Sequence, residues 1–426
     1  MIRYGTLAWI SKEQKYVLKR IWKARMESIP FYLCRLFRIC KRKIVFCCIE
    51  GTTGYSCNPK YIAEELLRTN QENKKNEEAF ELVWLVNDMT HKFPAGIRVV
   101  HNTLWNRAYH LTTARVWIDN SRKQLEVRKR KGQLYIQTWH AKLGFKPTCL
   151  DRGESFSRIA YLVSKHDSEM IDYVLSNSKW YDDTLPTGML YDGPVLRTGS
   201  PRCDILVKAR NDTTYKAKLR ARMMELSGME WQTEKAAPVR FLMYAPTFRG
   251  GSQRTRREVE AGSSFSAFGR LMDSLKKKFG GEWIILLRLH PQLVAGRQGR
   301  ADAGGKNVVD VSRVDDMYEL LAGCDAFMTD YSSAAFDAAV MKIPVFLYCD
   351  DYRAYEAERG RLLWDLEKLP FPLALNEEEL EDRILGFHEE EYRAGLQELF
   401  ETVEILEDGK AAERVVEFLG RIGRAE

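Results

Sequence analysis

The sequence lacks the long apolar run that a membrane-spanning helix requires, since no stretch of about 18 uncharged apolar residues occurs in its 426 residues. Its beginning, MIRYGTLAWISKEQK, is too polar for a secretory signal. Nine cysteines are scattered along the chain, and no CxxC pair is present. An odd number of dispersed cysteines favours reduced, buried thiols over a disulfide framework or a zinc site. These absences predict a cytoplasmic protein without a transmembrane helix.

The common nucleotide-binding fingerprints are also missing. No GxGxxG motif follows a predicted strand, and the GGKN stretch at 304–307 departs from a P-loop because asparagine replaces serine or threonine. Three aspartate pairs do not have the D-x-D spacing that would hold a metal-bound nucleotide: Asp182-Asp183, Asp315-Asp316 and Asp350-Asp351. We interpret each pair as a helix start or a solvated turn. Nothing in the sequence demands a metal or a cofactor.

The overall composition is that of a soluble globular protein, with 45% hydrophobic and 29% charged residues. A chain of this length is expected to form about two or three domains. Strands that alternate with helices predict an α/β protein with two doubly wound, Rossmann-type domains facing a cleft. The predicted segments are a basic amphipathic helical segment (1–43), an N-terminal domain (44–192), a C-terminal domain (193–376) and C-terminal helices (377–426).

The expected elements follow from apolar runs and helical periodicity. Strands are expected at 44–49, 82–86, 97–101, 115–118, 134–138, 173–175, 239–244, 283–289, 307–311, 326–329 and 345–348. Helices are expected at about 58–69, 104–113, 156–170, 178–187, 211–227, 264–279, 315–321, 377–387, 391–405 and 410–422. The glycines and prolines of 188–201 indicate the domain boundary.

The stretch 324–348 shows the strand–turn–helix–strand pattern most clearly. The apolar run 326–329 stops at Asp330-Tyr331-Ser332-Ser333, a helical pattern follows, and a second apolar run begins after Pro344. In such sheets, ligands bind outside the carboxyl ends of the strands. Ser332 and Ser333 stand at the expected helix start, where serine is either a simple cap or part of an anion site.

Other polar residues also follow predicted strands. His140 ends a strand of the first domain, and Thr247, Arg249 and His290 end strands of the second. A histidine in a cleft can act as a base on a hydroxyl or as a cation against phosphate, although a structural role is equally open. Arginine and the N–H groups of a helix start suit a pyrophosphate.

The charge of +7 is concentrated near the N-terminus. Residues 12–43 contain eleven lysines and arginines but only Glu13 and Glu27, and aromatic and aliphatic residues lie between them. This pattern favours an anionic membrane surface. The alternatives are a helix that simply packs on its own protein and a nucleic-acid contact, and the acidic stretch 377–391 argues against the latter.

Seven motifs together resemble the CDP-glycerol glycerophosphotransferases, which include teichoic acid primases, polymerases and capsule-associated relatives. They are GTTGYSCNPKYIAEEL (51–66), QTWHAKLGFK (137–146), SNSKW (176–180), TGSPRCD (198–204), YAPTFR (244–249), RLHP (288–291) and TDYSSAAFDAAVMKIPVFLYCDDYRAYEAERG (329–360). The motifs occur in the family's order from about residue 44 to 360.

The resemblance implies a GT-B-like fold and transfer of glycerol phosphate from CDP-glycerol, with release of CMP. It implies that His140 is the general base on the acceptor hydroxyl and that His290, also counted as catalytic, contacts the donor pyrophosphate. The substrate-binding residues that it implies are Thr247, Arg249, Arg288, Asp330, Ser332 and Ser333. The implied acceptor is a polyprenyl-diphosphate-linked saccharide, reached at the cytoplasmic face of the plasma membrane through the basic segment.

Three rival functions remain open at the level of sequence. A CDP-ribitol ribitolphosphotransferase and a GT-B glycosyltransferase that uses a nucleotide sugar would share the expected fold. A non-catalytic basic module would bind anionic lipid or nucleic acid through residues 12–43. We expect a glycerophosphotransferase that uses CDP-glycerol or a related CDP-polyol as donor and has no nucleic-acid partner.

Overall fold

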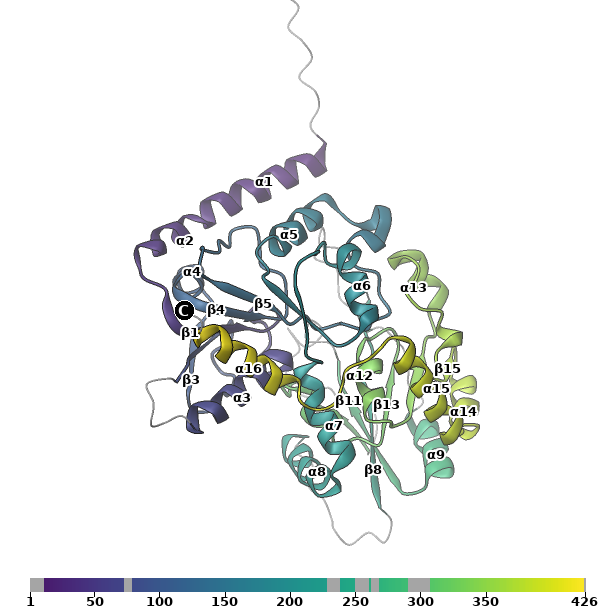
Figure 1. Ribbon diagram of the computed structural model, residues 1–426. Coiled ribbons are helices and arrows are strands. Elements are labelled where there is room, and N and C mark those ends of the chain that lie inside the picture. The colour runs from purple at the N-terminus through teal and green to yellow at the C-terminus, as the bar shows by residue number, and fades with distance from the viewer. Residues whose placement is uncertain are drawn as a thin grey trace, which may run out of the picture.

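The computed structural model of the chain describes residues 11–72, 79–227, 238–249, 260–261, 268–289 and 307–424. Two parallel β-sheets organise these residues, and helices cover them (Figure 1). Within the described ranges, no helix combines the length and the apolar character that crossing a bilayer would need.

The first sheet has seven parallel strands in the order β3-β2-β1-β4-β5-β6-β7. The strands are β1 (Cys40–Cys47), β2 (Glu81–Val86), β3 (Ile97–His101), β4 (Ala114–Asp119), β5 (Leu134–Gln137), β6 (Tyr173–Ser176) and β7 (Val195–Arg197). The helices between them are α3 (Cys57–Glu72), α4 (Leu104–Thr113), α5 (Arg158–Ser168) and α6 (Lys179–Gly188). One apolar cluster includes side chains of α4 and α6, and another includes side chains of α3.

The second sheet has six parallel strands in the order β12-β11-β8-β13-β14-β15. They are β8 (Val239–Tyr244), β11 (Glu282–Leu287), β12 (Val308–Asp310), β13 (Ala326–Thr329), β14 (Val345–Tyr348) and β15 (Leu373–Ala374). The helices α7 (Asp204–Asn211), α8 (Thr213–Ser227), α9 (Phe268–Phe279), α11 (Met317–Leu321), α12 (Ala334–Val340) and α13 (Tyr352–Arg359) accompany this sheet. A short pair, β9 (Phe248–Arg249) and β10 (Glu260–Ala261), lies outside it.

Both sheets share the strand order of a doubly wound Rossmann fold. In this order, strands are added first on one side of the first strand and then on its other side, so the direction of strand addition reverses there. The reversal falls between β1 and β4 in the first sheet and between β8 and β13 in the second. Ligand-binding residues are expected at these two places, just beyond the carboxyl ends of the strands. The predicted Rossmann-type architecture is therefore present in both sheets.

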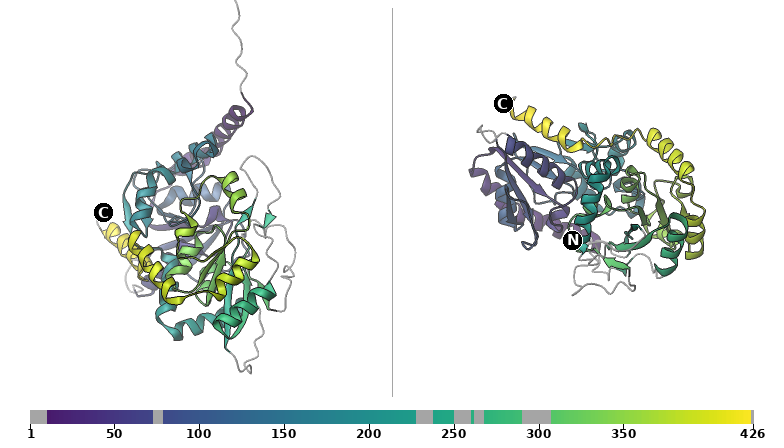
Figure 2. Two further views of the ribbon diagram at one scale, coloured as in Figure 1. Left: turned by 90° about the vertical axis from the view of Figure 1, so that its right-hand side faces the viewer. Right: turned by 90° about the horizontal axis from the view of Figure 1, so that it is seen from below.

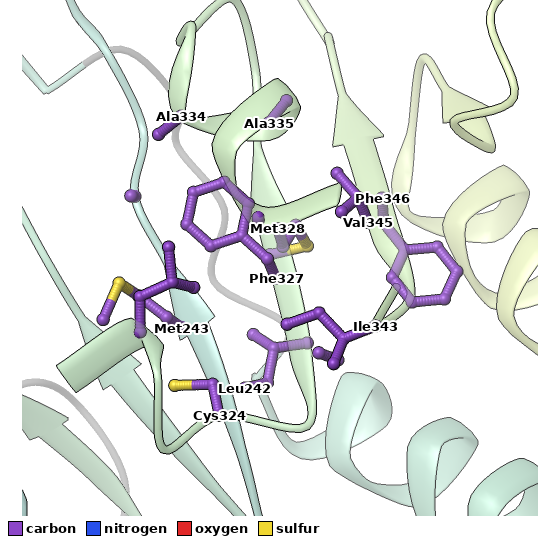
Figure 3. Packing of buried hydrophobic residues seen from close by; sticks show 14 of the residues in the cluster. Leu242, Met243, Cys324, Phe327, Met328, Ala334, Ala335, Ile343, Val345 and Phe346 are labelled. Atoms are coloured by element: carbon purple, nitrogen blue, oxygen red, sulfur yellow. The ribbon is translucent and has the colours of Figure 1, made fainter. Parts of the chain in front are cut away.

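The centre of the second sheet is packed around the predicted strand–turn–helix–strand unit. Phe327 and Met328 of β13 are buried between β8 and β14, and α12 packs against one face of β13 and β14 (Figure 3). Four alanines of α12 are buried, and their short side chains let the helix lie close to the sheet. This packing fixes the turn that carries Asp330, Ser332 and Ser333.

The C-terminal helices contact both sheets. Helices α14 (Glu377–Leu385) and α15 (Glu389–Thr402) pack with the second sheet, but α16 (Ala411–Arg424) returns to the first. Val415, Val416 and Leu419 join the apolar cluster that includes α3, and both views show α16 beside that helix (Figures 1 and 2). The C-terminal helices therefore link the two sheets.

The structure corrects several predicted boundaries. The basic segment 1–43 contains α1 (Lys12–Glu27) and α2 (Ile29–Leu33), but residues 40–43 belong to β1. Strand β7 lies beyond the predicted boundary at 192 and still completes the first sheet, because its backbone pairs with β6. Helix α7 (204–211) was not predicted, since the expected helix at about 211–227 corresponds to α8. It follows the TGSPRCD motif directly.

Candidate active site

The carboxyl edge of the second sheet brings three predicted residues together. Asp330, which is 1% exposed, accepts hydrogen bonds from the Thr247 amide and hydroxyl, both at 2.9 Å, and from the Tyr331 amide at 2.7 Å. Arg249 Nη1 lies 2.9 Å from the same carboxylate. Thr247 follows β8 and Asp330 follows β13, so this cluster lies between the two strands at which the strand order of the sheet reverses.

Arg249 is held by a second carboxylate that the sequence did not assign to the site. Its Nε and Nη2 donate to the two oxygens of Asp351 at 2.6 and 2.9 Å, and its guanidinium lies over the rings of Tyr331 and Tyr355. Burial opposes the charge, but the carboxylates of Asp351 and Asp330 raise the pKa of Arg249. Asp351 directly precedes α13, so the predicted helix start is confirmed, but it is not a solvated turn.

Ser332 and Ser333 stand at the start of α12, as predicted. Ser332 Oγ accepts a hydrogen bond from the Ala334 amide at 3.3 Å, which is a capping contact, whereas Ser333 makes no side-chain capping bond. The Cβ of Ser333 faces Gly144, where an added Cβ would lie 3.5 Å away. The loop that follows His140 therefore passes directly beside the start of α12. Phosphate binding by the two serines stays a prediction.

Arg288 follows β11 and faces the turn that leads to α11. Its Nη1 donates to the carbonyls of Val311, at 2.7 Å, and Val314, and burial lowers the pKa of Arg288 to about 10. In this structure, Arg288 thus fixes the turn before Asp315 and Asp316. His290 lies outside the described residues, so its predicted donor contact stays a prediction.

His140 follows β5 in the first sheet and has a preset tautomer. Its Nδ1 lies 2.8 Å from the backbone carbonyl of Asn120. A carbonyl oxygen only accepts hydrogen bonds, so Nδ1 carries the proton and Nε2 keeps its lone pair. Burial lowers the pKa of His140, although the bond to Asn120 raises it in part. This arrangement suits a neutral general base.

The contacts that join His140 to the second sheet were not predicted from the sequence. Arg202 Nη1 donates to the His140 carbonyl at 2.6 Å, and Nη2 donates to Asp337 of α12 at 2.6 Å. Phe145, five residues after His140, contacts Phe336 of the same helix, with tilted rings whose centroids lie 4.9 Å apart. The TGSPRCD motif contained Arg202, but no pattern in the sequence indicated which residues it contacts.

The described residues contain no group of three His, Cys, Asp or Glu side chains that could hold a metal ion. The cysteines in these ranges are free thiols.

Two Rossmann-type sheets with polar residues at neighbouring strand ends place the chain among two-domain α/β proteins. Residues 30–420 match the family model described as CDP-glycerol:poly(glycerophosphate) glycerophosphotransferase. Because this match spans most of the sequence, the chain belongs to that family, as the motifs predicted.

Named relatives agree with this assignment, and a solved structure shares the fold. The chain is 25% identical over 407 residues to the teichoic acid poly(glycerol phosphate) polymerase of Bacillus spizizenii, covering 93% of this chain and 96% of that protein. It is 26% identical over 338 residues to the enzyme of the same name from Staphylococcus epidermidis, covering 76% of this chain but only 42% of that longer protein. The wall teichoic acid polymerase TagF has the same fold, with a TM-score of 0.74 at 23% identity and 97% coverage of both chains.

Proposed function

We propose that the chain transfers glycerol phosphate, or a related polyol phosphate, from CDP-glycerol to a hydroxyl of a lipid-linked saccharide or polymer. The reaction releases CMP and serves the synthesis of teichoic acid or a capsule-type polymer. The observation that carries the proposal is the tautomer of His140, because an imidazole whose Nδ1–H is bound to Asn120 presents Nε2 as a base. Family membership supports the choice of donor.

The proposed reaction is an in-line displacement at the β-phosphorus of the donor. His140 Nε2 takes the proton of the acceptor hydroxyl, the oxygen forms a bond to phosphorus, and the bond to CMP breaks. Arg249, His290 and the Ser332-Ser333 turn neutralise charge on the phosphates, and Thr247 with Asp330 positions Arg249. Such transfers depend mainly on positioning and electrostatic stabilisation.

A panel of nucleotides in a thermal-unfolding experiment tests the donor. A ligand that binds only the folded state raises the midpoint of unfolding. We expect CDP-glycerol or CDP-ribitol to raise it and UDP- or GDP-sugars to leave it unchanged. Stabilisation by a UDP- or GDP-sugar alone would replace this proposal with a nucleotide-sugar glycosyltransferase.

The pH dependence of turnover provides a prediction about His140. The base acts only when Nε2 is unprotonated, so kcat/KM is expected to rise with pH as His140 loses its proton. Burial lowers the pKa of His140 below its ordinary value of 6.5, and the midpoint of the rise should therefore lie below pH 6.5. Initial rates measured from pH 5 to 9 check this. A midpoint well above pH 6.5 would mean that another group causes the rise of kcat/KM.

The N-terminal helices support the proposed contact with an anionic membrane surface. Trp22 is 65% exposed and Leu36 is 86% exposed, and further exposed apolar side chains of this segment are Leu18, Met26, Ile29, Tyr32, Leu33 and Phe37. The rings of Phe37 and Tyr109 of α4 are in contact, with centroids 5.3 Å apart. This contact extends the exposed apolar surface to α4, which also carries the exposed Trp105. Basic residues of 12–43 flank these side chains, as expected for a helix lying in a headgroup region.

Binding to vesicles tests this surface. The double variant Trp22→Ala, Leu36→Ala is expected to bind phosphatidylglycerol-containing vesicles at least about 10-fold more weakly, because it removes two large exposed apolar side chains. The matched control is Met89→Ala, Leu375→Ala, which removes two exposed apolar residues elsewhere. Equal binding by both variants and the parent chain would remove the membrane role from this segment.

A further inference from the structure

Arg202 lies between the two sheets and is only 5% exposed. It belongs to the short 3₁₀-helix Pro201–Cys203, immediately before α7. Its guanidinium has one arm on each side: Nη1 donates to the carbonyl of His140, and Nη2 donates to the carboxylate of Asp337, both at 2.6 Å. One side chain thus connects the loop of the proposed base with helix α12.

The backbone that Arg202 contacts is strained. Trp139 has a φ of 50°, a conformation that bulky L-residues seldom adopt without support from their surroundings. The Trp139 amide donates to Gln137 Oε1 at 3.0 Å, and Asn58 Nδ2 donates to the Trp139 carbonyl at 2.8 Å. Asn58 Oδ1 in turn accepts from the Arg202 amide at 3.1 Å. Arg202 therefore completes a set of bonds that holds the turn immediately before His140.

The other end of the connection is equally fixed. Asp337, in the first turn of α12, accepts a hydrogen bond from the Tyr318 hydroxyl at 2.6 Å. The Arg202 guanidinium also lies over the Tyr318 ring, 4.9 Å from its centroid. A buried ion pair contributes little net stability compared with apolar packing, so its more useful property is the geometry that it imposes.

From these contacts we infer that Arg202 is a positioning residue for the transfer reaction, holding the base His140 at a fixed place relative to the donor-side helix α12 through Asp337. The inference rests on the proposed function, since it concerns the same site. Both terminal nitrogens of Arg202 donate to protein groups, so the proposed effect of Arg202 on the reaction is exerted through His140. A shift of about 1 Å in a catalytic group can lower a rate by about 100-fold, so the loss of this connection should mainly affect kcat.

The charge of Arg202 has a second effect that can be measured without turnover. Burial, Arg202 and Arg122 lower the pKa of His140, whereas the bond to Asn120 and negative charge on the Cys57 sulfur raise it. Replacing Arg202 with methionine leaves Asp337 without its cation and removes one of the charges that lower the pKa of His140. The pKa of His140 should therefore rise in this variant and stay close to its original value in Arg202→Lys, which retains the charge.

The experiment compares Arg202→Met, Arg202→Lys and Asp337→Asn in the full chain. All three are expected to lower kcat for CDP-glycerol, by about 100-fold for Arg202→Met, with KM for the donor changed by less than about threefold. Lysine lacks the two-armed guanidinium and cannot bridge both partners, so Arg202→Lys should also lose turnover. NMR titration of the histidine ring signals gives the pKa of His140 in each variant.

The matched control is Lys60→Met. Lys60 and Asp316 are each 3% exposed, and Lys60 Nζ lies 2.7 Å from Asp316, so this pair also connects the two sheets. Lys60→Met should lower the midpoint of thermal unfolding about as much as Arg202→Met, but should keep kcat and the His140 titration near those of the parent chain. If Arg202→Met fails to fold, Arg202→Lys and Asp337→Asn carry the test.

Two results would overturn the inference. One is an unchanged kcat and an unchanged His140 titration in Arg202→Met, and the other is an equal loss of kcat in Lys60→Met, which would indicate general loosening of the two sheets. A parent chain that releases no CMP from any CDP-polyol would refute the proposed function instead. The NMR titration would still decide whether Arg202 acts on His140.

Discussion

His140→Ala is expected to lower kcat by about 1,000-fold while leaving the affinity for CDP-glycerol within about threefold of that of the parent chain. The variant lacks the imidazole that the Asn120 carbonyl orients, so it has no Nε2 to take the proton of the acceptor hydroxyl. Donor affinity should persist because the predicted donor residues lie at the carboxyl edge of the second sheet. Single-turnover rates and calorimetric titration of CDP-glycerol measure the two quantities separately.

His166 offers a matched control for this experiment. It is also half-buried, its Nε2 lies 3.0 Å from the backbone carbonyl of Val127, and burial lowers its pKa as well. It lies in α5, and the proposed mechanism gives it no role. His166→Ala should therefore keep kcat within about threefold. Loss of donor binding in His140→Ala, with kcat little changed at saturation, would move His140 to the donor side of the site.

Arg249→Gln and Asp351→Asn are expected to change donor affinity in opposite directions. If Arg249 binds a donor phosphate, its loss should weaken CDP-glycerol binding on the order of 100-fold, because hydrogen bonds between charged groups are the strong ones. Asp351 accepts hydrogen bonds from two of the guanidinium nitrogens, so it would compete with a phosphate for them. Asp351→Asn weakens that competitor and should tighten binding.

The control for Arg249 is Arg220, whose partner Asp325 lies at the end of β13 opposite to Asp330. Arg220 pairs with Asp325, which directly precedes β13, whereas Asp330 directly follows it. Arg220→Gln removes an arginine–carboxylate pair of the same sheet away from the predicted phosphates, and it should leave donor affinity unchanged. Weaker binding in both Arg249→Gln and Asp351→Asn would mean that the pair is structural and that Arg249 does not contact the donor.

The parts of the fold that depend on local sequence could be predicted closely. The strands at 97–101, 239–244, 326–329 and 345–348 agree with the structure to the residue, because each is a short apolar run between turn residues. The same logic predicted that Thr247, Asp330 and His140 lie at strand ends, and in the structure Asp330 directly follows β13 while Thr247 and His140 each lie three residues beyond their strands. Parallel strands then bring their carboxyl ends to one edge, which explains why Thr247 and Asp330 meet although 83 residues separate them.

The contacts that complete the site could not be predicted in this way. The bond from Arg202 to His140 spans 62 residues and that from Arg249 to Asp351 spans 102, and side-chain pairs at such separations leave no periodic pattern in a sequence. Strand β7, at one edge of the first sheet, was not predicted, for a related reason. Strand β7 is a three-residue edge strand with little burial, and its place depends on pairing with β6 and not on its own apolar pattern.

Release of CMP by the full chain, incubated with CDP-glycerol and a polyprenyl-diphosphate-linked saccharide, tests the proposed transferase activity most directly. We expect one CMP for each glycerol phosphate that appears on the acceptor, and much less CMP when the acceptor is omitted or His140 is replaced. The absence of CMP with glycerol, ribitol and related CDP-polyols, under conditions in which the chain is folded, would contradict it.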